Sequence, residues 1–112
     1  MEFPPTCIIK FTATWCGPCK AIHPFLEQCG KDCDIPVCVV DVDEYGSLAE
    51  EYQVTSIPHM EFRYNGETQA VIKGANKEKI FQEFQNLKKK KNQISLPTLK
   101  EAELKNGRDN AE

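Results

Sequence analysis

Two cysteines separated by two residues, Cys16 and Cys19, are the part of this sequence best suited to chemistry. They follow an apolar run and precede a segment with helical spacing, so Cys16 is expected on the first turn of a helix. Free backbone N–H groups and the helix dipole stabilise a thiolate there, and the thiolate is the reactive form of cysteine. Cys19 falls on the same helical face, close enough to close a disulfide ring. The pair is therefore predicted to be a redox dithiol, with a zinc half-site or an inert structural disulfide as the alternatives.

The elements that must position this pair follow one another in an order typical of an α/β fold with a mixed sheet. The predicted elements are a strand over 6–12, a helix over 17–31, a strand over 36–42, a helix over 47–52, strands over 59–64 and 68–73, and a helix over 76–88. The first two strands are near-continuous apolar runs, as in buried parallel strands. Asn65-Gly66 between the last two strands is a strong hairpin signal.

Local signals predict where the helices begin and end. Gly30 is expected to end the first helix, and Ser47 with Glu50 is expected to form a capping box at the start of the second. Asn76 is expected to cap the last helix. One face of that helix carries Ile80, Phe81, Phe84 and Leu87, and Lys88 to Lys91 follow its end.

The composition is that of one globular domain. The chain has 112 residues, of which 40% are hydrophobic and 28% charged. No apolar run approaches the ~20 residues that span a membrane, and no secretory signal is visible. A net charge of −3 argues against general nucleic-acid binding. The domain is expected over 1–91, followed by a polar tail over 92–112 with a short helix over 98–106.

Six cysteines are many for this length. In a secreted chain they would predict a disulfide framework, but without a signal a reducing compartment, the cytoplasm, is expected. Cys7 and Cys38 lie in apolar runs and are expected to be small core residues. Cys29 and Cys33 are bystanders, a regulatory pair or two metal ligands. The first is favoured, with no metal expected, because no His or Cys cluster completes a zinc site.

The segment Ala13-Thr14-Trp15-Cys16-Gly17-Pro18-Cys19-Lys20 resembles the active-site segment of the thioredoxin family. Further matches follow in the same order as in the family, at residues 41–43, 54–58, 65–66 and 74–79. The resemblance covers roughly residues 6 to 90. It is specific because Trp-Cys-Gly-Pro-Cys after a strand is joined by an Ile-Pro about forty residues later.

This resemblance implies a thioredoxin-like fold and a thiol–disulfide oxidoreductase that reduces protein disulfides. Cys16 would attack the substrate disulfide and Cys19 would resolve the mixed disulfide. No bound cofactor is implied, because the Cys16–Cys19 disulfide is the redox group; NADPH would supply electrons through a thioredoxin reductase. The runner-up is a thioredoxin-fold binding or regulatory protein with weak redox turnover, and a third interpretation is a disulfide isomerase or oxidase.

The resemblance also implies roles for residues around the cysteines. Pro18 would tune the reduction potential toward the reducing end. Trp15 would lie over the site with its indole N–H bonded to Asp43. Ile57-Pro58 would be a cis peptide that faces Cys16 and offers the backbone of Ile57 to an extended substrate. The implied substrate-binding residues are Trp15, Gly17, Ile57, Pro58 and Gly74.

Two residues depart from the family pattern. Lys10 stands where the family has a buried Asp beneath the cysteines. It would act as a neutral base, stabilise a thiolate on Cys19 or Cys16 as a cation, or reach the surface along its aliphatic stem. His59 follows the proline, where Thr is common in the family. It would either bias Cys16 toward thiolate or face solvent.

The beginning of the sequence is the third departure. Only five residues precede the first predicted strand, whereas the family opens with a further strand and helix. The fold is therefore expected to be shortened at its N-terminus, with 36–42 as an unpaired apolar edge. The tail, with a strand over 94–96, or a second chain in a homodimer would cover this edge; a truncated gene model or splice form is a third explanation.

Overall fold

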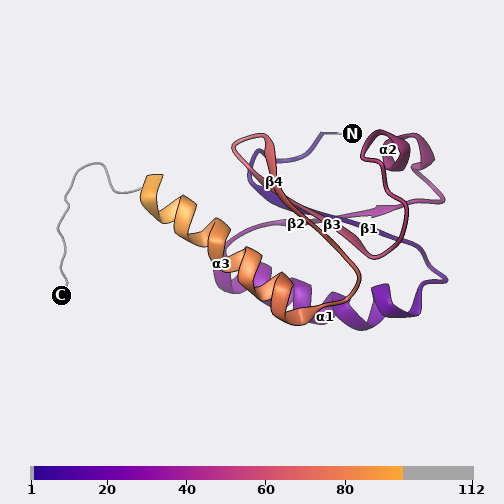
Figure 1. The fold of residues 1–112 in the computed structure, drawn as a ribbon, viewed down its shortest axis with the longest axis horizontal. Helices are drawn as coiled ribbons and strands as arrows, with labels where there is room; N and C mark the ends of the chain where they lie inside the picture. The colour runs from indigo at the N-terminus through magenta and orange to yellow at the C-terminus, as the bar shows by residue number, and fades with distance from the viewer. Residues whose placement is uncertain (1, 95–112) are drawn as a thin grey trace.

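Strands and helices alternate along the part of the chain that the computed structural model describes, residues 2–94 (Figure 1). The elements are β1 (Cys7–Thr12), α1 (Gly17–Cys33), β2 (Val37–Asp41), α2 (Gly46–Glu51), β3 (His59–Tyr64), β4 (Glu67–Lys73) and α3 (Lys77–Ile94). Each corresponds to a predicted element, which confirms the α/β order.

The sheet is mixed, as predicted, and β1 lies inside it. The strand order is β2-β1-β3-β4, with β1 parallel to β2 and antiparallel to β3. β3 and β4 form the predicted hairpin, in which Asn65 and Gly66 have φ values of 57° and 87°. Among the described residues β2 lies at an edge, and Val39 on it is 50% exposed. The expectation of an apolar edge strand is thus confirmed.

Helices cover both faces of the sheet (Figure 1). On one face, α1 and α3 pack on a core that includes Ile8, Met60 and Phe62. On the other face, α2 and the following loop pack on a core built around Ile9 and Phe11. Successive residues of β1 therefore point to opposite cores, and Lys10 points to the side of α1.

Two predicted helix boundaries are wrong. α1 continues through Gly30 and ends at Cys33, and its C-cap residue Asp34 is left-handed with φ 56°. Gly30 instead allows the backbone of Ile35 to lie close to the helix, since a Cβ on residue 30 would lie 2.8 Å from the carbonyl oxygen of Ile35. α2 begins at Gly46 with Tyr45 as its N-cap, and no side chain caps it. The predicted capping box of Ser47 is not formed, because the turn after β2 starts the helix earlier.

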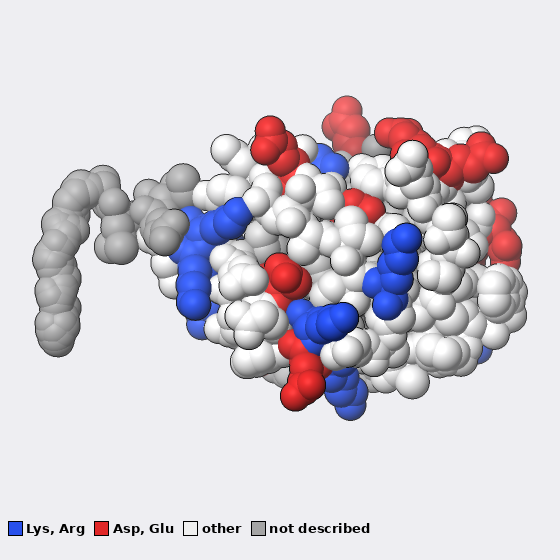
Figure 2. Space-filling view, in the orientation of Figure 1, with Lys and Arg blue, Asp and Glu red and all other residues white. Residues whose placement is uncertain are grey.

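The last helix starts as predicted and runs further. The Asn76 side-chain oxygen accepts the backbone N–H of Lys79 at 3.1 Å. α3 then extends to Ile94, so that the four lysines lie within it rather than after it. Figure 2 shows basic side chains gathered toward this end of the molecule. Phe81 is 51% exposed, whereas its three predicted companions are buried.

The remaining predictions for the tail concern residues that the structure does not describe. The strand expected from 94 falls partly on α3, which ends at Ile94. The helix over 98–106 lies outside the described residues. No helix within residues 2–94 is long and apolar enough to cross a membrane.

Candidate active site

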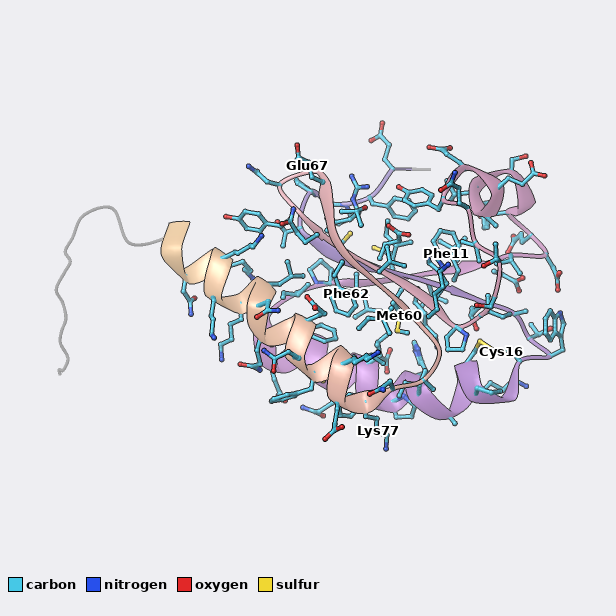
Figure 3. All side chains as sticks on the ribbon, in the orientation of Figure 1. Phe11, Cys16, Met60, Phe62, Glu67 and Lys77 are labelled. Atoms are coloured by element: carbon cyan, nitrogen blue, oxygen red, sulfur yellow. A yellow bond between two sulfur atoms is a disulfide. The ribbon has the colours of Figure 1, made fainter. Side chains whose placement is uncertain are left out.

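The two cysteines lie at the junction between β1 and α1 (Figure 3). Cys16 is the N-cap residue of α1, and Cys16 and Cys19 form a disulfide with a Cα–Cα distance of 5.3 Å. The Sγ atom of Cys16 accepts the backbone N–H of Cys19 at 3.2 Å. Pro18 lies in the first turn, where its missing N–H leaves no helical bond unmade. In the reduced pair, this N–H and the helix dipole favour negative charge on Cys16.

Trp15 stands out from the surface beside the disulfide. Its side chain is 68% exposed, which excludes a core role. Its indole N–H donates to a carboxylate oxygen of Asp43 at 2.8 Å, as the family resemblance implied. Trp15, Val42 and Ile57 line one shallow cavity of about 380 Å³. Val42 and Ile57 also pack against the buried cysteine pair, so this cavity adjoins the redox group.

The loop before β3 brings a second surface to the cysteines. The Ile57-Pro58 peptide is cis, as predicted. The carbonyl oxygen of Pro58 accepts the N–H of Gly74 at 2.8 Å, and Gly74 has φ +99°, which favours glycine. Gly17 is exposed at the start of α1, with nothing within 4 Å of the place where a Cβ would lie. All the implied substrate-binding residues thus lie around one end of the sheet.

Lys10 is buried beneath the cysteines, with only 2% of its surface exposed. Its Nζ atom donates to the backbone carbonyl oxygen of Cys19 at 2.7 Å and lies 3.2 Å from Nδ1 of His23. The expectation that this side chain reaches the surface is therefore wrong, because α1 packs over it. Burial lowers the pKa of Lys10, and the nearby Glu27 carboxylate opposes that shift.

His23 and Glu27 extend this cluster to the surface, and the sequence argument missed both. Nε2 of His23 lies 3.2 Å from a carboxylate oxygen of Glu27. The signal was present, since Cys19, His23 and Glu27 recur every fourth residue of one helix and so share a face. Lys10, Cys19 and His23 also line a cavity of about 630 Å³ that opens beside β2.

His59 is buried on the opposite face of the sheet and does not face solvent. Its Nε2 atom lies 2.6 Å from a carboxylate oxygen of Glu61, and its ring packs edge-on against Phe11. Glu61 is a third residue that was not predicted from the sequence. Alternation along β3 could have found it, because residues two apart on a strand share a face.

The other cysteines are unpaired in the described residues. Burial beside Cys38 raises the pKa of Cys7 to about 12. Burial also raises the pKa values of Cys29 and Cys33. Buried thiols of this kind are inert, which agrees with their interpretation as bystanders. No group of three or more His, Cys, Asp or Glu residues within 2–94 is arranged to hold a metal ion.

Comparisons with known proteins agree with this site. The family model described as Thioredoxin matches residues 4–89. Thioredoxin H3 of Arabidopsis thaliana is 40% identical over 89 residues, which cover 79% of this chain and 73% of that protein. Thioredoxin of Gallus gallus is 38% identical over 81 residues, covering 71% and 77%.

Solved structures give the same result. The oxidised thioredoxin of Plasmodium falciparum superposes with a TM-score of 0.66 at 37% identity, covering 73% of this chain and 80% of that one. Mitochondrial thioredoxin 3 of Saccharomyces cerevisiae gives a TM-score of 0.70 at 32% identity, covering 74% and 79%.

Proposed function

The chain belongs to the thioredoxin family and is a thiol–disulfide oxidoreductase that reduces protein disulfides, and we propose how its residues divide that reaction. Cys16 attacks a sulfur of the substrate disulfide as a thiolate and forms a mixed disulfide. Cys19 then attacks Cys16, which releases the reduced substrate and restores the Cys16–Cys19 bond. The observation that supports this division is the position of Cys16 at the N-cap, where its Sγ accepts a backbone N–H.

The substrate lies across the surface formed by Trp15, Gly17, Ile57, Pro58 and Gly74. An exposed Trp15 and a small apolar cavity beside the disulfide support this assignment. An extended peptide would pair with the backbone near Ile57, which packs against the cysteine pair. Such a surface recognises unfolded or loop segments through their backbone and leaves their sequence largely free.

Pro18 and Lys10 tune the redox pair. Pro18 does so from its position between the two cysteines, within the ring that their disulfide closes. Lys10 does so by donating a hydrogen bond to the backbone carbonyl oxygen of Cys19. For His59, the bond to Glu61 supports a structural role in place of the tuning role expected from the sequence.

No bound cofactor takes part, and a flavin-dependent thioredoxin reductase returns electrons from NADPH to the disulfide. The family supports this source of electrons. The four unpaired cysteines among the described residues support a reducing compartment, the cytoplasm. Nucleic acids and membranes are not expected partners.

Two copies of the chain pair along the exposed edge of β2 to form a homodimer. The apolar edge and the half-exposed Val39 support this pairing. Light scattering over a range of concentrations tests it, with Val39→Lys expected to give the monomer. A wild type that is monomeric at every concentration contradicts the pairing and leaves residues 92–112 as the next candidate cover, to be tested by their deletion.

Reduction of insulin disulfides tests the proposed function. The wild type is expected to reduce insulin with dithiothreitol, and with NADPH and a thioredoxin reductase. Cys16→Ser should abolish turnover, whereas Cys19→Ser should accumulate a covalent adduct with the substrate. Cys38→Ser is the control, because Cys38 lies on β2 away from the pair. Activity with dithiothreitol but not with NADPH and thioredoxin reductase would contradict thioredoxin reductase as the source of electrons. No activity with either reductant would favour a binding protein.

A further inference from the structure

Lys10, His23 and Glu27 form a continuous line from the redox pair to solvent. The line starts at the backbone carbonyl of Cys19, passes through Lys10 Nζ at 2.7 Å and His23 Nδ1 at 3.2 Å, and ends where His23 Nε2 meets Glu27 at 3.2 Å. Exposure rises along it, because Lys10 is 2% exposed while the side chains of His23 and Glu27 are 33% and 58% exposed. Every member is a group that can gain and lose a proton.

We propose that these three residues are a proton relay for Cys19, in which His23 and Glu27 act through Lys10. The relay rests on the proposed function, because Cys19 needs to lose a proton on each turnover only if it is the resolving thiol. It gives His23 and Glu27 a role in the reaction, and it replaces the single buried carboxylate of the family pattern with a chain that crosses the helix.

The hydrogen-bond donors and acceptors fit a relay in both of its states. When Lys10 is an ammonium it donates to Nδ1 of His23, and the imidazole then carries its proton on Nε2 and donates to Glu27. When Lys10 is neutral its lone pair accepts from a proton on Nδ1. An imidazole can therefore take a proton on one nitrogen and release another from the second.

The charges around the line also suit a mobile proton. Burial disfavours the ammonium form of Lys10 and lowers its pKa, and the Glu27 carboxylate opposes that shift. No titratable residue of β3 lies opposite Lys10, because its partner there is Met60. The other titratable residues that line the same cavity are Lys20, Asp41, Glu44 and Tyr45. That cavity of about 630 Å³ has room for water beside Lys10 and Cys19.

The resolving step moves one proton away from Cys19 and exchanges one disulfide bond for another. In the mixed disulfide, neutral Lys10 takes the proton of the Cys19 thiol through water in the cavity that both residues line. The Cys19 thiolate attacks Cys16, the Cys16–Cys19 bond forms, and the bond from Cys16 to the substrate sulfur breaks. The substrate leaves as a thiolate and takes a proton from water. Lys10 passes its extra proton to Nδ1 of His23, and Nε2 of His23 releases one to Glu27 and solvent.

Acid-quench mass spectrometry of a single turnover tests the relay. The full-length reduced protein is mixed with a peptide disulfide, and the mixed disulfide on Cys16 is followed over time between pH 6 and pH 10. His23→Gln and Lys10→Gln should slow the decay of this adduct about tenfold or more near pH 7. Glu27→Gln should slow it about threefold, because water can replace the exposed carboxylate. Alkylation of Cys16 by iodoacetamide measures the attacking thiol separately.

The pH profile separates a relay from a merely structural role. Hydroxide can take the proton of a thiol directly as the pH rises, so the difference between wild type and variants should become smaller toward pH 10. Glu51→Gln, which removes an exposed carboxylate on α2, is the matched control and should follow the wild type. His23→Gln with a wild-type decay rate at every pH, or with decay and Cys16 alkylation slowed equally, would overturn the relay alone. A wild type that forms no adduct on Cys16 would overturn the proposed function itself.

Discussion

Two clusters pair a histidine with charged side chains on opposite faces of the same sheet. On the α1 face, Lys10 contacts His23, whose other nitrogen faces the exposed Glu27. On the α2 face, His59 contacts Glu61, and both side chains are buried. The clusters lie within one register step of each other, since Phe11 pairs with His59 and Lys10 with Met60.

The clusters differ in where their hydrogen bonds lead. The second oxygen of Glu61 accepts the hydroxyl of Thr68, which fixes the carboxylate but takes up no proton from it. Nδ1 of His59 has no hydrogen-bond partner within residues 2–94. The first cluster instead ends in a carboxylate that is exposed to solvent. Burial alone thus does not identify a reactive group; the connection to solvent separates the cluster that fixes β3 from the one suited to move a proton.

Glu61→Ala should have the largest effect, and this effect should be a loss of stability. It leaves the Nε2 atom of His59 buried without its partner, which is expected to cost about 3 kcal/mol of unfolding free energy. Urea denaturation measures this cost. Glu67→Ala, on the exposed end of β4, is the control. Insulin reduction by folded Glu61→Ala should match the wild type; a large loss of rate with little loss of stability would reverse the roles assigned to the two clusters.

Lys10→Met should show the opposite pattern. Replacing a buried cation by an apolar side chain of similar length is expected to leave stability unchanged or raise it by about 1 kcal/mol. Decay of the mixed disulfide should nevertheless slow about tenfold or more at neutral pH. Denaturation and single-turnover kinetics on the same preparation measure both. Destabilisation without a kinetic change would mean that Lys10 serves the fold and not the reaction.

The framework of the site could be predicted from the sequence because its signals are local. Spacing and the strand–helix junction place Cys16 at the start of a helix, and Asn65-Gly66 specifies its hairpin through positive φ angles. The Trp15–Asp43 bond followed from the family resemblance. By contrast, the continuation of α3 through four lysines was missed although lysine is a good helix former.

The surroundings of the cysteines could not be predicted in the same way. Whether a lysine in the middle of a strand is buried depends on the helix that packs over it, and His23 supplies the partner that keeps Lys10 inside. The direction of His59 likewise depends on Glu61 and on the packing of Phe11. These are tertiary contacts, and a residue type at one position does not specify them.

Thr68→Val should lower the stability of the fold by less than Glu61→Ala does. It removes the hydroxyl that donates to Glu61 at 3.0 Å but leaves the bond to His59. The expected cost is about 1 kcal/mol in unfolding free energy, because the threonine is exposed and water can replace part of the bond. Thr55→Val, at another exposed threonine, is the control for valine at the surface. A cost equal to that of Glu61→Ala would show that the hydroxyl, and not the histidine, holds the carboxylate.

Lys10 is expected to make the free energy of unfolding depend on pH. Its pKa in the folded chain is lowered from 10.5 by burial. Between the lowered value and 10.5 the unfolded chain binds more protons at this group than the folded chain, so this group makes stability rise with pH through that window. The raised pKa of Cys7 acts in the opposite sense above pH 9, where the unfolded thiol ionises first. The difference between wild type and Lys10→Met cancels the shared thiol contribution.

Urea denaturation of both proteins at intervals from pH 7 to pH 10.5 measures that difference. The free energy of unfolding of the wild type should rise relative to Lys10→Met as the pH increases, because the wild type loses the cost of a buried ammonium. A constant difference would mean that Lys10 has the same pKa in the folded and unfolded chains, which water or Glu27 would achieve by solvating the ammonium. Lys10 would then carry its ammonium charge at neutral pH, and because an ammonium has no lone pair to take the Cys19 proton, this result would contradict the relay.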